Sequence, residues 1–188
     1  MTERYKYGAV AIAIHWATAL FIITNLVLGH VMEGAPMSSR FLLISLHIWI
    51  GLSVLLLTVL RIVWRLSHPK PAYADPLKPH EARLAGLVQM AFYGLLLALP
   101  LLGYLLVSAN APNPARHLTF WGVVPVPFLG YLQHLDRPLQ VVVHDQLVQA
   151  HALAAWLMVG TLALHLAGVA KHMVIDRINI LKRMSPFN

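Results

Sequence analysis

Four long apolar runs constrain the fold of this chain more than any other feature of its sequence. They cover residues 8–31, 41–64, 84–108 and 141–173. Each run is long enough to cross a bilayer as a helix, which takes about 20 residues. Only 11% of the 188 residues are charged, which is too few to give a soluble domain its polar surface. The sequence therefore predicts an all-α integral membrane four-helix bundle, with residues 1–188 as a single domain.

The basic residues predict how the bundle is oriented. Of the 14 Lys and Arg residues, only Arg40, Arg116 and Arg137 lie on one side of the predicted bundle. All others lie in the N-terminal tail, the connection between the second and third runs, and the C-terminal end. The positive-inside rule then predicts that both termini are cytoplasmic. Because the basic residues flank apolar runs and form no patch with interleaved aromatics, they predict a lipid membrane as the partner and no nucleic acid.

Histidines within the runs are the candidate functional residues, because an ionisable group inside a membrane is costly. His15 lies toward the cytoplasmic side of the first run, and His47 lies toward the outer side of the second. The fourth run carries His151 toward the outer side and His165 toward the cytoplasmic side. Depth therefore predicts an inner pair, His15 with His165, and an outer pair, His47 with His151.

The spacing on the fourth run indicates what the pairs bind. Fourteen residues make nearly four helical turns, so His151 and His165 share one face and lie about 21 Å apart. Two imidazoles that face each other across a bundle suit the two axial positions of a haem iron. The chain has no cysteine, so covalent attachment is excluded and the prediction is two non-covalent haem b groups.

Several alternatives to this interpretation stay open. A single membrane histidine can simply hydrogen-bond to a backbone carbonyl. His144 and His172 lie seven residues outside His151 and His165 on the same face, so either could replace a ligand or bind a haem propionate. Met158 lies midway between the two levels, which favours packing over iron ligation. Small residues near the histidines could let a flat macrocycle approach the helices: Gly51, Ala154, Ala155, Gly160, Ala167 and Gly168.

Four segments resemble the bacterial diheme cytochrome b561 proteins, which are related to the cytochrome b subunits of nickel–iron hydrogenases. They are RYKYGAVAIAIHW, LHIWIGLSVLLLTVLRIVWR, HALAAWLMVGTLALH and the tail AKHMVIDRINILKRM. The resemblance covers nearly the whole chain and is weakest between the third and fourth runs. It implies a multi-pass protein of the bacterial inner membrane, with haem ligands His15, His47, His151 and His165. Arg61 and Arg65 match the family's arginines at the end of the second span, where they either neutralise the propionates of the inner haem or lie solvated at the membrane surface.

The expected function is electron transfer between a small donor and the quinone pool. The resemblance implies ubiquinone as the substrate to be reduced, and in one branch superoxide as the donor. An outer site for such an anion would need Arg40, Arg116 and Arg137, with His117 and His134. Two alternatives remain, namely a cytochrome b subunit that relays electrons from a partner dehydrogenase or hydrogenase, and a non-redox transporter that uses histidine. The connection from about 109 to 138 is expected to fold over the outer end of the bundle.

Overall fold

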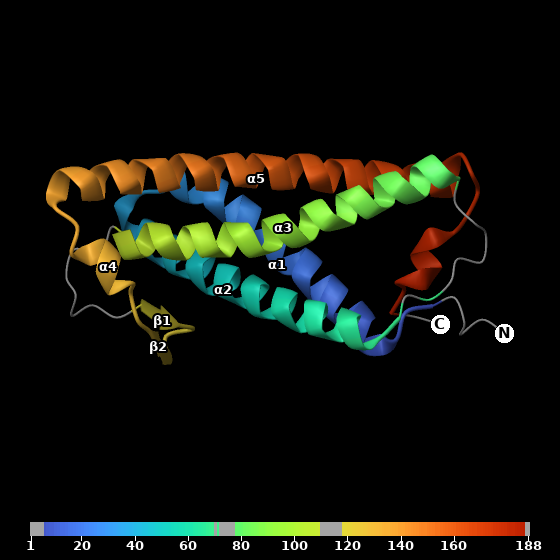
Figure 1. Cartoon of the computed structure of the whole chain (residues 1–188), viewed down its shortest axis with the longest axis horizontal. Helices are drawn as coiled ribbons and strands as arrows, with labels where there is room; N and C mark the ends of the chain where they lie inside the picture. The colour runs from blue at the N-terminus through green and yellow to red at the C-terminus, as the bar shows by residue number, and fades with distance from the viewer. Residues whose placement is uncertain (1–5, 70, 72–77, 110–117, 187–188) are drawn as a thin grey trace.

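The computed structural model describes residues 6–69, 71, 78–109 and 118–186, and four long helices dominate it (Figure 1). They are α1 (Ala9–Gly34), α2 (Met37–Ser67), α3 (Pro79–Ala109) and α5 (Arg137–Val174). All four are long and apolar enough to cross a membrane. The predicted runs lie within these helices, except that Gly8 precedes α1. Each helix continues a few residues further, because helical hydrogen bonding persists beyond the apolar segment.

Local sequence explains where the helices begin and end. Pro36 separates α1 from α2, since it provides no N–H for continuing α1 but can precede a new helix. Pro79 opens α3 at a first-turn position, where its fixed φ is favourable. Pro100 lies inside α3 and removes the hydrogen bond that the carbonyl of Leu96 would otherwise accept.

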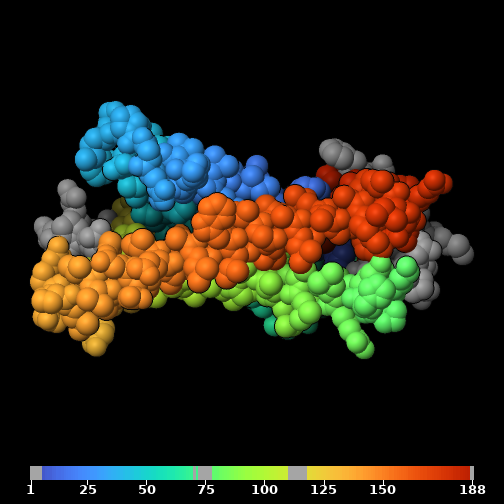
Figure 2. Space-filling view, turned by 90° about the horizontal axis from the view of Figure 1, so that it is seen from above, coloured from blue at the N-terminus to red at the C-terminus, as the bar shows by residue number. Residues whose placement is uncertain are grey.

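The helices pack as two pairs. α1 packs along α2, α3 packs along α5, and α2 and α3 join the pairs. Figure 2 shows α5 running the length of the molecule, with a hollow between its N-terminal half and the connection of α1 to α2. One apolar core at mid-height holds the bundle together: Ile22, Ile50, Val54, Leu96, Leu99, Ala154 and Met158. Met158 and Val54 are both 0% exposed, which confirms the packing role expected for Met158.

The connection between α3 and α5 contains elements that the sequence did not predict. They are a two-stranded antiparallel hairpin of β1 (Leu118–Phe120) and β2 (Val124–Val126), and the short helix α4 (Gly130–Gln133). Figure 1 shows them at one end of the bundle, as expected, although the hairpin lies beside α2 rather than across the end. We call this the outer end.

The opposite end carries both ends of the described chain. The 3-10 helix η2 (Ile180–Arg183) follows α5 there, and the N–H of Tyr7 donates to the carbonyl of Arg183 at 3.1 Å. The indole N–H of Trp16 also donates to the carbonyl of Met184 at 2.7 Å. The two ends of the sequence are therefore tied together at what we call the inner end.

Candidate functional site

The outer pair of histidines meets between α2 and α5. The ring centroids of His47 and His151 lie 6.1 Å apart, at an interplanar angle of 71°. Metal–imidazole bonds of about 2 Å, with roughly 1 Å from each nitrogen to its ring centre, would set two axial rings roughly 6 Å apart. The outer pair therefore has the separation that a bis-histidine iron requires.

Neighbouring helices orient this pair and leave room beside it. Nδ1 of His47 lies 3.2 Å from the carbonyl oxygen of Asn25 on α1, an acceptor, so this nitrogen donates and Nε2 is left for a ligand. A methyl group on Gly29 would lie 3.4 Å from Cε1 of His47, and one on Gly103 would lie 3.3 Å from Cε1 of His151. A methyl group at Gly103 would thus press on the ring of His151, and one at Gly29 would come into van der Waals contact with the ring of His47.

The inner pair lies at the other level of the bundle. His165 and the guanidinium of Arg61 are both within electrostatic range of His15, and Arg61 is also within range of His165. Aromatic side chains flank the pair. Trp16 lies 5.4 Å from the ring of His15, and Phe92 lies 5.5 Å from the ring of His165.

A cavity of about 310 Å³ opens at the inner end. Arg61 and Arg65 both line it, as do Lys6 and His68, and none of the described lining residues is Asp or Glu. The ring of Tyr93 lies 5.8 Å from the guanidinium carbon of Arg61 and supports it from α3. The structure therefore brings the two predicted arginines together in a basic cavity suited to carboxylates.

A fourteen-residue interval recurs on all four helices. It links His15 to Gly29 on α1, and His47 to Arg61 on α2. It links Gln89 to Gly103 on α3, and His151 to His165 on α5. At 1.5 Å per residue each interval spans about 21 Å, so every helix presents one of these residues at each level. Gly29 and Gly103 were missed as site residues, although this interval from His15 could have revealed Gly29.

The other sequence candidates occupy different environments. Gly160 and Gly168 have no atom within 4 Å of an added Cβ, and Gly51 faces the amide of Asn25, so these three do not line the imidazoles. Whether these residues give a flat macrocycle room stays a prediction, and Gly29 and Gly103 are the glycines that lie beside the outer imidazoles. Ala154 belongs to the mid-height core.

The proposed outer donor site gains no support from the described arginines. The guanidinium of Arg40 donates to the carbonyl of Glu33, and that of Arg137 donates to Gln140 at 2.9 Å. Arg40 on α2 is thus engaged with the end of α1, and Arg137 is engaged within the first turn of α5. Arg116 and His117 lie outside the described residues, and His134 follows α4 at the outer end.

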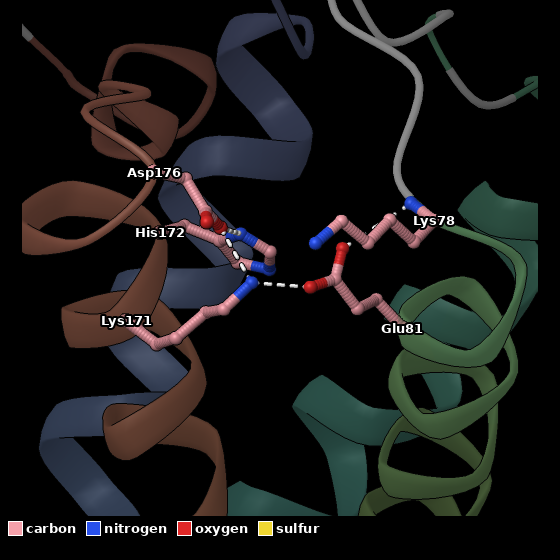
Figure 3. Close-up of polar contacts among 5 residues, drawn as sticks. All are labelled: Lys78, Glu81, Lys171, His172 and Asp176. Carbon is pink, nitrogen blue, oxygen red and sulfur yellow. Dashed lines mark hydrogen bonds and ion pairs between the residues drawn. The ribbon is translucent and has the colours of Figure 1, made fainter.

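His144 and His172, the possible substitute ligands, each pair with a carboxylate. Nδ1 of His144 lies 3.1 Å from Asp145, and Nδ1 of His172 lies 2.7 Å from Oδ2 of Asp176. Figure 3 shows the second contact within a network at the inner end, in which Lys171 bridges Asp176 and Glu81. The hydrogen bond from Lys171 lowers the pKa of Asp176, and the bond from His172 acts in the same direction. This network fastens α3 to α5 and to the tail.

The donor set fits haem better than a multidentate metal centre. Within the described residues, no three His, Asp or Glu side chains converge as ligands for a bare metal ion, whereas imidazoles occur in pairs. Nδ1 of His15 is buried without a hydrogen-bond partner, an arrangement that is costly unless a ligand is bound or the ring reorients. The outer pair therefore has a geometry that fits a haem, and the assignment of His15 and His165 to a second haem stays a prediction.

Comparison with known proteins agrees with this chemistry. The chain is 27% identical to cytochrome b561 homolog 2 of Escherichia coli K12 over 189 residues, covering 95% of this chain and 90% of the relative. It is 25% identical to the probable superoxide oxidase CybB of Yersinia pestis, covering 96% of each chain. The family model for prokaryotic cytochrome b561 matches residues 6–187. The chain therefore belongs to the prokaryotic cytochrome b561 family, and is a multi-pass, haem-binding electron-transport protein of the bacterial inner membrane.

Proposed function

We propose that this protein is a diheme b-type cytochrome that oxidises superoxide at its outer end and reduces ubiquinone. The observation that carries the proposal is the outer pair, with imidazole centres 6.1 Å apart. His47 and His151 hold the outer haem, and His15 and His165 hold the inner one. The haem b that each pair would hold would supply one-electron redox chemistry.

The residues around each pair set the conditions for this chemistry. The carbonyl of Asn25 fixes the ring of His47, and Gly29 and Gly103 keep the space beside the outer imidazoles clear. Arg61 and Arg65 provide positive charge for carboxylates at the inner end. The buried core at mid-height separates the two levels and excludes water between them.

The choice of substrates rests on likeness to the relative named as a probable superoxide oxidase. In balance, two superoxide anions give two molecules of dioxygen and two electrons, which convert ubiquinone and two protons to ubiquinol. We further propose that the inner end, with its Lys and Arg residues, is cytoplasmic, so that both termini lie in the cytoplasm. The chain is then one cytochrome domain with an outward-facing donor side.

Substrate turnover tests the proposal directly. Purified protein receives superoxide and a short-chain ubiquinone, and superoxide loss and ubiquinol formation are followed together. We expect one ubiquinol for every two superoxide anions consumed, and no ubiquinol from the His151→Ala variant. Haem that is reduced only by a co-purified dehydrogenase, with no reaction toward superoxide, would instead identify a relay subunit and refute the superoxide assignment.

A further inference from the structure

The hairpin between α3 and α5 lies alongside the membrane-spanning helices rather than above them. The indole N–H of Trp121 at its tip donates to Oγ of Ser53 at 3.1 Å. Ser53 lies 16 residues after Met37 and 14 before Ser67, close to the middle of α2. It is also six residues, or about 9 Å, further along α2 than His47. The tip therefore contacts α2 at a greater depth than the outer histidine pair.

Contacts with α3 show that the end of the returning strand lies near the level of the outer histidine pair. The hydroxyl of Tyr104 donates to the carbonyl of Pro127, just after β2. Tyr104 follows Gly103, the glycine beside His151, so Pro127 lies near the level of the outer pair. Further out, the N–H of Leu129 donates to the hydroxyl of Ser108 at 3.3 Å. The chain thus follows α3 outward from Pro127 to Leu129, and β1 and β2 lie below that point.

The side chains of the hairpin suit a hydrocarbon environment. Residues 118–133 contain no charged group. Val123 is 80% exposed, Val124 is 53% exposed and Trp121 is 45% exposed. Leu56 and Val59 of α2, just past Ser53, are exposed as well, so the apolar surface of the hairpin continues the membrane surface of that helix. Exposure of this apolar patch to water would be unfavourable, whereas contact with acyl chains avoids the free-energy cost of hydrating it.

Several polar groups of the hairpin find partners within the protein, which burial in lipid requires. β1 and β2 pair with each other, and the N–H of Val123 closes the turn on the carbonyl of Phe120 at 3.1 Å. The indole N–H of Trp49 donates to the carbonyl of Thr119. Pro125 and Pro127 bring no N–H at all, which reduces the donors that lipid cannot satisfy.

The turn itself is built to direct Trp121 onto α2. Trp121 and Gly122 have φ of 51° and 72°, both in the left-handed region. Glycine adopts this conformation readily, whereas for tryptophan it is strained. The strain at Trp121 is offset by its hydrogen bond to Ser53 and by the ring of Trp49, whose centroid is 5.6 Å away. These contacts hold the hairpin in place against the helix.

We infer that the β1–β2 hairpin re-enters the membrane at the outer end, and that its tip, Trp121 to Val124, contacts the acyl chains of the outer leaflet. The hairpin thereby covers the lipid-facing side of α2 next to the outer histidine pair. This inference rests on the depth of the contacts and on apolar exposure, and it is independent of the electron donor and acceptor.

Site-directed spin labelling tests the inference, and the natural absence of cysteine makes single labels simple. Val123→Cys carries a nitroxide in protein reconstituted into phospholipid vesicles. Leu153→Cys on α5, 62% exposed, is the lipid reference, and the exposed Asp136→Cys is the water reference. Collision rates with oxygen and with a water-soluble nickel chelate are measured by power saturation of the EPR signal.

We expect the label at Val123 to collide more with oxygen than with the nickel chelate, as at Leu153. A higher collision rate with nickel than with oxygen, as at Asp136, would overturn the inference. A second label at Val124, the neighbouring exposed position, repeats the test if Val123→Cys does not fold. Helical circular dichroism confirms that each labelled protein is folded before it is measured.

Discussion

Replacing Gly103 by leucine should weaken the outer haem selectively. An added Cβ at Gly103 already lies 3.3 Å from Cε1 of His151, so even alanine must displace the ring by a few tenths of an ångström. Leucine adds three further carbons to the space beside that ring. Overpacking of this kind costs about 1–3 kcal/mol, which corresponds to roughly 5- to 150-fold weaker binding of the outer haem.

The matched control is Gly160→Leu on α5, because an added Cβ at Gly160 meets no atom within 4 Å. Haem is titrated into both variants, and the two sites are followed by their low-spin EPR signals. We expect Gly103→Leu to lose the outer signal first and keep the inner one, with Gly160→Leu close to wild type. Equal loss in both variants, or an outer haem unchanged by Gly103→Leu, would refute the placement of this glycine beside the haem.

Four further predictions follow from the same structure. His151→Ala should leave one haem per chain, and the remaining haem should be lost only when His165→Ala is added; pyridine haemochrome content measures both. Arg61→Gln should lower the midpoint potential of the inner haem by roughly 40 mV, since a cation worth on the order of 1 kcal/mol to the reduced state is lost, as redox titration would reveal. A C-terminal green fluorescent protein should fluoresce and a C-terminal alkaline phosphatase should be inactive, and the reverse result would place that end outside the cytoplasm. Because the native pKa of Asp176 is lowered from 3.8, its contribution to stability is present above that pH and is lost as the pH falls through the native value. Melting temperatures of wild type and Asp176→Asn should therefore converge in acid, and a constant difference would contradict this account.

The four helices and the levels of their histidines could be predicted from sequence because the bilayer fixes both. A membrane helix has a known rise and must run from one side to the other, so position in the sequence becomes depth. His47 and His151 are 104 residues apart in the chain, yet depth alone placed them at one level, and the structure sets their rings 6.1 Å apart.

The glycines beside the outer pair, the hairpin and the network around Lys171 depend on contacts between distant parts of the chain, which sequence periodicity cannot predict. Gly29 and Gly103 act on imidazoles of other helices, so the contacts themselves form only when α1 meets α2 and α3 meets α5, although the interval from His15 marks Gly29 in the sequence. The hairpin requires a tryptophan in a left-handed turn, a conformation that local preference opposes and the contact with Ser53 supports. The network around Lys171 joins Glu81 to Asp176, which lie 95 residues apart in the chain.

The measurement that tests the central claim most directly is haem stoichiometry with a reduced-minus-oxidised absorbance spectrum of the wild-type protein, purified in detergent from haem-replete cells. The account predicts two haem b groups per chain, both low-spin and six-coordinate, because each level of the bundle provides two imidazoles. A single haem per chain, or high-spin haem at either level, would contradict the assignment of His15 with His165 and His47 with His151.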